Sequence, residues 1–73
     1  MSGKRDRFVR LAESRTRNAL KNIRLIGNLS NRNTYSFDPG DVDVILRALD
    51  AEIKSTRRRF QQSKDSGIEF SLV

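Results

Sequence analysis

The 73-residue chain contains no cysteine and no histidine. Without cysteine, a disulfide cannot form and thiolate metal sites are excluded. Without histidine, imidazole metal ligands and the commonest general base are missing as well. We therefore predict no catalytic residue, no cofactor and no metal site, and we expect that the chain is not an enzyme.

Glycine is scarce too, and none of the four glycines belongs to a phosphate-binding loop. The acidic residues Asp38, Asp41 and Asp43 form the one cluster that could be interpreted as a metal or acid–base site. Their spacing does not fit a calcium loop. Helix capping and compensation of the helix dipole account for all three, so we favour a structural role.

Long apolar runs are also absent. No segment approaches the roughly 18 consecutive apolar residues of a membrane-spanning helix. Residues 1–6 lack the apolar stretch that follows the charges of a signal peptide. The absence of cysteine fits a reducing compartment. Together these features predict a cytoplasmic protein with no membrane partner.

The first half of the chain has the apolar period of a helix over residues 5–26, with residues 1–4 expected to be flexible. Basic side chains lie opposite the apolar face. That face comprises Phe8, Val9, Ala12, Thr16, Ala19, Ile23 and Ile26. Gly27 follows it, and we expect Gly27 to end the helix in a left-handed conformation.

A second helix is predicted over residues 39–62, after a loop over residues 27–38. Asp38 suits the N-cap and Pro39 the first helical position. Asp41 lies where a capping box places its acid, and Phe37 and Val42 occupy the positions of a hydrophobic staple. The start of this helix is therefore strongly marked.

These two helices predict an all-α fold, an antiparallel two-helix hairpin. A chain of this size buries only roughly 60% of its unfolded surface. Small scaffolds are stabilised by disulfides, a metal or oligomerisation, and oligomerisation is the remedy left here. We therefore predict a homodimer that forms a four-helix bundle. The residues assigned to the core or dimer face are Phe8, Ala12, Ala19, Ile23, Ile45, Leu46, Leu49, Ile53 and Phe60.

Residues 63–73 are expected to form a flexible C-terminal tail. An alternative is a short strand that docks on a partner's sheet edge or on the bundle. It is suggested by Ile68, Phe70 and Leu72, which alternate with the period of a strand.

The net charge of +6 is unevenly distributed, because residues 1–26 carry eight basic and two acidic side chains. Positive charge at the start of a helix opposes the helix dipole. An antiparallel hairpin would bring the start of the first helix beside the end of the second. The candidate polyanion-binding residues gathered there are Lys4, Arg5, Arg7, Arg10, Arg57, Arg58 and Arg59.

Three functions remain open. The leading interpretation is a homodimeric interaction or adaptor module. The alternative is a small accessory or regulatory protein that binds DNA or RNA through the basic set, although no helix-turn-helix, zinc-finger or RNA-binding motif is present. A third option is a helix donor that completes a larger protein's bundle.

Arg15 lies close to the apolar face, and we expect it to reach Asp50 or Glu52.

Residues 26–32 read Ile-Gly-Asn-Leu-Ser-Asn-Arg, followed by Tyr35 and then by the pair Asp41-Val42. Further along the same pattern are Ile45, Ala48, Leu49, Glu52, Arg59 and Phe60. The pattern resembles that of small uncharacterised bacterial helical proteins, in which an "NLSNR..Y" loop precedes a helix that opens with an acid and a valine. The resemblance covers residues 8–60. It implies a bacterial origin and a helical fold, and it brings no activity to transfer.

Overall fold

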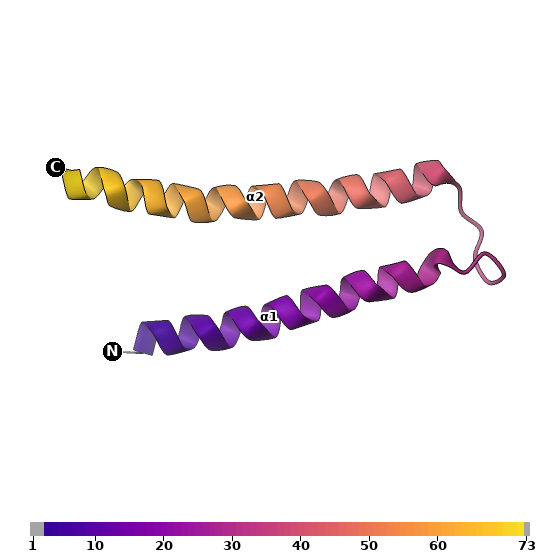
Figure 1. Cartoon of the computed structure of the whole chain (residues 1–73), viewed down its shortest axis with the longest axis horizontal. Coiled ribbons are helices and arrows are strands. Elements are labelled where there is room, and N and C mark those ends of the chain that lie inside the picture. Colours follow the sequence, from indigo (N-terminus) through magenta and orange to yellow (C-terminus); the bar gives the residue numbers. More distant parts are fainter. Residues whose placement is uncertain (1–2, 73) are drawn as a thin grey trace. The chain divides into compact units, whose positions relative to one another are not determined.

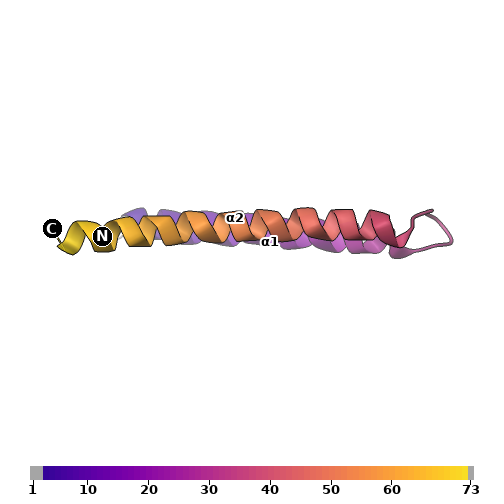
Figure 2. The ribbon, with the colours of Figure 1, turned by 90° about the horizontal axis from the view of Figure 1, so that it is seen from above.

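The computed structural model describes the backbone of residues 3–72 and the side chains of residues 3–63. Helix α1 spans Gly3–Gly27, a short 3-10 turn η1 spans Asn28–Ser30, and helix α2 spans Pro39–Leu72 (Figures 1 and 2). No strand occurs in residues 3–72. The all-α class is therefore confirmed.

The chain divides into two compact units. Residues 1–36 hold α1 and η1, and residues 37–73 hold α2. The pairing of the two helices into a hairpin stays a prediction.

Helix α1 begins at Gly3, earlier than the predicted residue 5. Gly3 and Lys4, expected to be flexible, are thus helical, whereas Met1 and Ser2 lie outside the described residues. Lys4 and Arg5 favour helix intrinsically, and Asp6 in the first turn complements the dipole. These local preferences extend the helix towards the N-terminus.

The prediction that Gly27 adopts a left-handed conformation is wrong. Gly27 has φ −60° and ψ −30°, which are right-handed helical values. No residue in the described part of the chain has a positive φ. The backbone stays right-handed as the α-helix passes into the narrower 3-10 turn η1, so α1 ends in a 3-10 turn.

The loop after η1 is organised by Asn31. Its carbonyl accepts hydrogen bonds from the backbone N–H of Thr34 (3.1 Å) and of Tyr35 (2.9 Å). Its side-chain Oδ1 accepts another from the N–H of Asn33 at 3.0 Å. Asn31 itself is extended, with φ −75° and ψ 102°. This Asn side chain therefore closes the turn through hydrogen bonds, as Asx turns do.

The predicted capping box at the start of α2 is confirmed. Asp38 Oδ1 accepts a hydrogen bond from the Asp41 N–H at 2.9 Å. Asp41 Oδ2 accepts one from the Asp38 N–H at 3.0 Å. Two backbone donors that the helix itself cannot satisfy are thus paired reciprocally.

Helix α2 continues past Gln62, its predicted end, and reaches Leu72. The backbone of residues 63–72 is helical, so the structure does not place a strand at Ile68, Phe70 and Leu72. Val73 lies outside the described residues. No proline follows Pro39. Among residues 62–72, Gly67 is the one with a strongly unfavourable helix propensity. The sequence therefore contains no firm stop signal in this segment.

None of the side chains described in residues 3–63 is buried. Over the described residues, no helical stretch combines the length and the apolar character that a membrane span requires.

Candidate functional site

The apolar face of α1, here called the α1 seam, is the first candidate surface. Its residues recur in alternating steps of three and four, which is the spacing of a coiled-coil seam. They are Val9, Ala12, Thr16, Ala19, Ile23 and Ile26. Small side chains occupy its centre, so a partner helix could approach α1 closely there.

Phe8 borders the α1 seam and is 50% exposed. The guanidinium carbon of Arg5 lies 5.9 Å from the centre of the Phe8 ring. A cation–π contact at such an exposed site contributes about 0.5–1 kcal/mol. Arg5, which was predicted to bind a polyanion, therefore also covers an aromatic ring.

The corresponding face of α2, the α2 seam, has the same alternating steps and larger side chains. It comprises Val42, Leu46, Leu49, Ile53, Thr56 and Phe60. Leu49 is half-buried, whereas Leu46 and Ile53 are each 53% exposed and Phe60 is 63% exposed. Thr56 Oγ1 donates to the Glu52 carbonyl at 2.9 Å, so this hydroxyl is already satisfied within its own helix.

All nine residues predicted for the core or dimer face lie on α1 or α2. Ala12 and Leu49 are half-buried, and the other seven are exposed. The structure brings four of them together along α1 and five along α2. Contact between the two groups stays a prediction.

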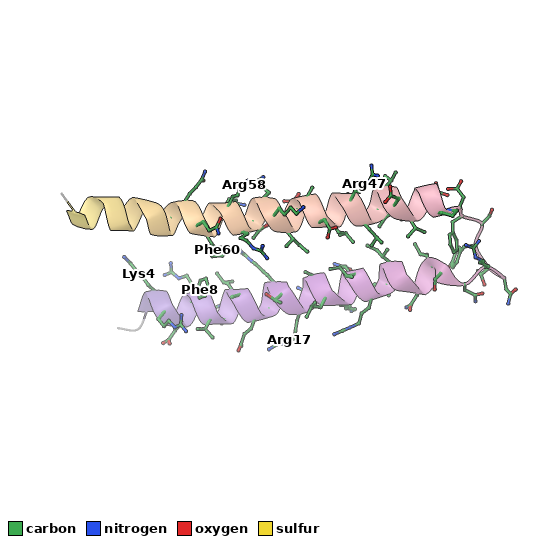
Figure 3. The ribbon with its side chains drawn as sticks, turned by 45° about the horizontal axis from the view of Figure 1, so that its top comes forward. Lys4, Phe8, Arg17, Arg47, Arg58 and Phe60 are labelled. Carbon is green, nitrogen blue, oxygen red and sulfur yellow. The ribbon has the colours of Figure 1, made fainter. Side chains whose placement is uncertain are left out.

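The predicted polyanion-binding residues are divided between the two units. Lys4, Arg5, Arg7 and Arg10 lie in the first turns of α1, in one unit. Consecutive residues of a helix point about 100° apart, so Arg57, Arg58 and Arg59 project from different sides of α2. Figure 3 shows Arg58 and Phe60 on opposite sides of that helix. These three arginines therefore do not form a single patch on their own.

The net charge of the chain is concentrated on α1. Helix α1 carries eight basic and two acidic side chains, a net charge of +6. Helix α2 carries six of each sign and is neutral. The positive potential of this protein therefore belongs to one helix.

Within α1, the polar face carries a row that we call the basic ridge. It comprises Arg7, Arg10, Arg17, Lys21 and Arg24. All five side chains are exposed. Arg17 makes a long ion pair with Glu13 at 3.8 Å. Arg17 projects from the side of α1 opposite Phe8 (Figure 3).

The predicted polyanion-binding residues do not include Arg17, Lys21 and Arg24. The available signal was their recurrence at steps of three and four, the same spacing that reveals an apolar seam.

The acidic cluster has local partners throughout. Asp38 and Asp41 form the capping box, and Asp43 Oδ2 pairs with Arg47 at 2.9 Å. In the described residues, no group of three or more acidic side chains could hold a metal ion. These contacts support the structural interpretation of all three aspartates.

No family model, no curated protein and no solved structure matches the chain. The resemblance to small bacterial helical proteins therefore stays a prediction.

Proposed function

We propose that the chain is a non-enzymatic interaction module of the cytoplasm, an antiparallel helical hairpin that pairs with a second copy to form a four-helix bundle. The observation that carries this proposal is the pair of exposed seams with matching coiled-coil spacing. Isolated helices are marginal in water and gain most of their stability from packing of an apolar face. The seams therefore need a partner surface.

The side-chain sizes of the two seams favour one antiparallel register. Setting Ala19 opposite Leu46 also sets Ala12 opposite Ile53, since each step is one heptad. Small residues of α1 then face large residues of α2 in successive layers, which fills space well. Covering the exposed half of a Leu or Ile side chain contributes on the order of 1 kcal/mol.

Charges beside the seams agree with this register. It places Arg15 near Glu52, one of the two acids that the sequence predicted as its partner. It also places Asp6 near Arg57 on the other flank. Opposite charges at these flanking positions select partner and orientation in coiled coils.

A second copy is favoured because apolar side chains remain outside the two seams. Leu25 of α1 is 51% exposed and Val44 of α2 is 69% exposed. A hairpin shields each helix on one side only, so these residues widen the surface left uncovered. Pairing of two hairpins would cover it with the same residues from both copies.

The register is tested by cysteine cross-linking, which is clean because the chain has no cysteine of its own. Ala12→Cys combined with Ile53→Cys should oxidise readily to a disulfide within one chain. Ala12→Cys with Leu46→Cys is the control, displaced by one heptad. Equal oxidation of both pairs would contradict the register, and a disulfide between chains would indicate exchanged helices.

Association is tested by the solution mass, which should be twice the chain mass of 8.4 kDa. Leu49→Ala should cost about 2–5 kcal/mol, enough to unfold a chain of marginal stability. Lys54→Ala lies on the polar face of α2 and should change stability by about 0.5 kcal/mol at most. A monomer with an exposed seam would instead favour a helix donor for a larger protein, and an unchanged melt of Leu49→Ala would contradict the seam.

A second candidate function is nucleic-acid binding by an accessory or regulatory protein. It is favoured by the net charge of +6 on α1. In the proposed register, Arg5 lies opposite Phe60. The basic start of α1 would then lie beside Arg57, Arg58 and Arg59. Its test is a DNA titration over a series of salt concentrations, in which neutralising Lys4 and Arg5 should weaken binding.

A further inference from the structure

The basic ridge is a surface within one helix, so it does not depend on how the two units are arranged. From Arg7 to Arg24 it extends about 25 Å at 1.5 Å per residue. Its five side chains are exposed, and Arg7, Arg10, Lys21 and Arg24 form no ion pair with any described residue. The ridge is therefore a row of available cations.

Along the polar face of α2, the charged side chains are arranged in the order that stabilises a helix. There the signs alternate through Asp43, Arg47, Asp50 and Lys54, and Asp43 pairs with Arg47 at 2.9 Å. Opposite charges three or four residues apart stabilise a helix by about 0.2–0.5 kcal/mol, and like charges destabilise it by similar amounts.

In the ridge, like charges occupy neighbouring positions instead. Arg7 and Arg10 are three residues apart, and Lys21 is four residues from Arg17 and three from Arg24. Each of these pairs opposes helix formation.

Two acids lie on the same side of α1: Glu13 pairs with Arg17 at 3.8 Å, and Asp6 lies four residues before Arg10. Arg7, Lys21 and Arg24 have no acidic side chain three or four residues away. Helix stability therefore does not account for these three cations, whereas binding of an anion would.

The ridge also stays accessible when α1 packs through its seam. On a helix of 3.6 residues per turn, the ridge is centred about 150° from the α1 seam. Covering the seam leaves the ridge in solvent. Dimerisation and ligand binding can therefore use opposite faces of the same helix.

We propose that the basic ridge binds the phosphate backbone of double-stranded DNA. Duplex DNA carries one negative charge per about 1.7 Å of its axis, so a 25 Å length of duplex carries about 15 phosphate charges on its two strands together. Four of the five cations are arginines, whose guanidinium forms bidentate hydrogen bonds with phosphate. This inference rests on the second candidate function and names a different surface for it.

Other polyanions fit the ridge less well. A basic helix that binds an anionic membrane also buries its apolar face in lipid. In the proposed bundle α2 covers the α1 seam, so that face is not available to lipid. Single-stranded nucleic acid is held by aromatic stacking, and the ridge has no aromatic residue. The deep major groove of duplex RNA excludes a helix, whereas that of B-form DNA admits one.

The test uses three variants of the full chain that each lose two positive charges. Arg17→Gln with Lys21→Gln alters the ridge alone. The start of α1 is altered by Lys4→Gln with Arg5→Gln. Each protein is titrated into a labelled DNA duplex of about 20 base pairs, longer than the ridge, at several salt concentrations.

The matched control removes the same charge from α2, through Arg47→Gln with Lys54→Gln. Loss of two phosphate contacts should reduce the slope of log affinity against log salt by about 1.8 for the ridge variant. The control should leave the slope nearly unchanged. Arg17→Lys keeps the charge and should retain most of the binding, and circular dichroism checks that each variant keeps its helices.

The outcomes separate the ridge from the broader function. If only the variant at the start of α1 loses binding, nucleic-acid binding stands and the ridge assignment fails. Equal losses in the ridge variant and the α2 control would reduce the effect to net charge and overturn the proposal. No binding to duplex DNA at low salt would overturn both the nucleic-acid-binding function and the ridge proposal. Binding to anionic vesicles that depends on the ridge, without binding to DNA, would overturn both as well.

Discussion

Replacing Gly27 by alanine tests how α1 ends, because the sign of the effect depends on the backbone conformation. Gly27 has φ −60° and ψ −30°, values that alanine adopts without strain. A Cβ built there meets no atom within 4 Å. Alanine replaces glycine at compatible positions with a gain of about 0.4–1 kcal/mol. We expect Gly27→Ala to raise the free energy of unfolding by about this amount.

Gly40 is the matched comparison, since it also lies in right-handed helix. A Cβ at Gly40 would lie 3.1 Å from Asp38 Oδ1, the oxygen that caps α2. The gain in helix propensity would therefore be offset by displacement of that oxygen from the Asp41 N–H. We expect Gly40→Ala to gain less stability than Gly27→Ala.

Both variants are compared by urea and thermal unfolding followed by far-ultraviolet circular dichroism. One protein concentration is used throughout, because association makes the melting temperature depend on concentration. A change of 0.4–1 kcal/mol corresponds to about 2–8 °C for a domain of this size. A lower melting temperature for Gly27→Ala would refute the reasoning, because it would indicate that Gly27 is left-handed after all.

Two further predictions concern α2. Asp38→Ala removes the capping oxygen and should cost about 0.5–2 kcal/mol, whereas Asp38→Asn keeps an acceptor and should cost much less; equal melts of the two variants would show that the cap contributes nothing. Thr56→Val keeps the shape of the side chain and removes the hydroxyl that bonds back to the Glu52 carbonyl. Because such bonds slightly weaken helices and the position lies on the α2 seam, Thr56→Val should raise the melting temperature and strengthen association, as measured by unfolding and sedimentation at several concentrations.

The features that the sequence predicted correctly depend on neighbouring residues. The capping box needs only Asp38 and Asp41, three positions apart, so its geometry follows from local chemistry. The two helices likewise follow from the apolar period. The hand of Gly27 was not predictable in this way, because glycine adopts positive and negative φ with similar ease.

The end of α2 was mispredicted for a related reason. A helix ends where its backbone is stopped and not where its apolar face ends. Neither proline nor a capping motif follows Gln62. The sequence also placed basic side chains opposite the apolar face of α1. The predicted polyanion-binding residues were chosen because they lie at the open end of the predicted hairpin, and this choice left out Arg17, Lys21 and Arg24.

Helix α1 is basic and helix α2 is neutral. Salt should therefore affect the two proposed activities, self-association and DNA binding, in opposite directions. Repulsion among the ridge cations weakens α1, and salt screens that repulsion. Salt should therefore favour the folded, associated chain while it weakens attraction to phosphates. Helix α2 is neutral, so it contributes little net attraction to phosphates. The positive charge on α1 thus destabilises the helix alone and stabilises it when a polyanion is bound, so folding of α1 and binding to DNA would reinforce each other.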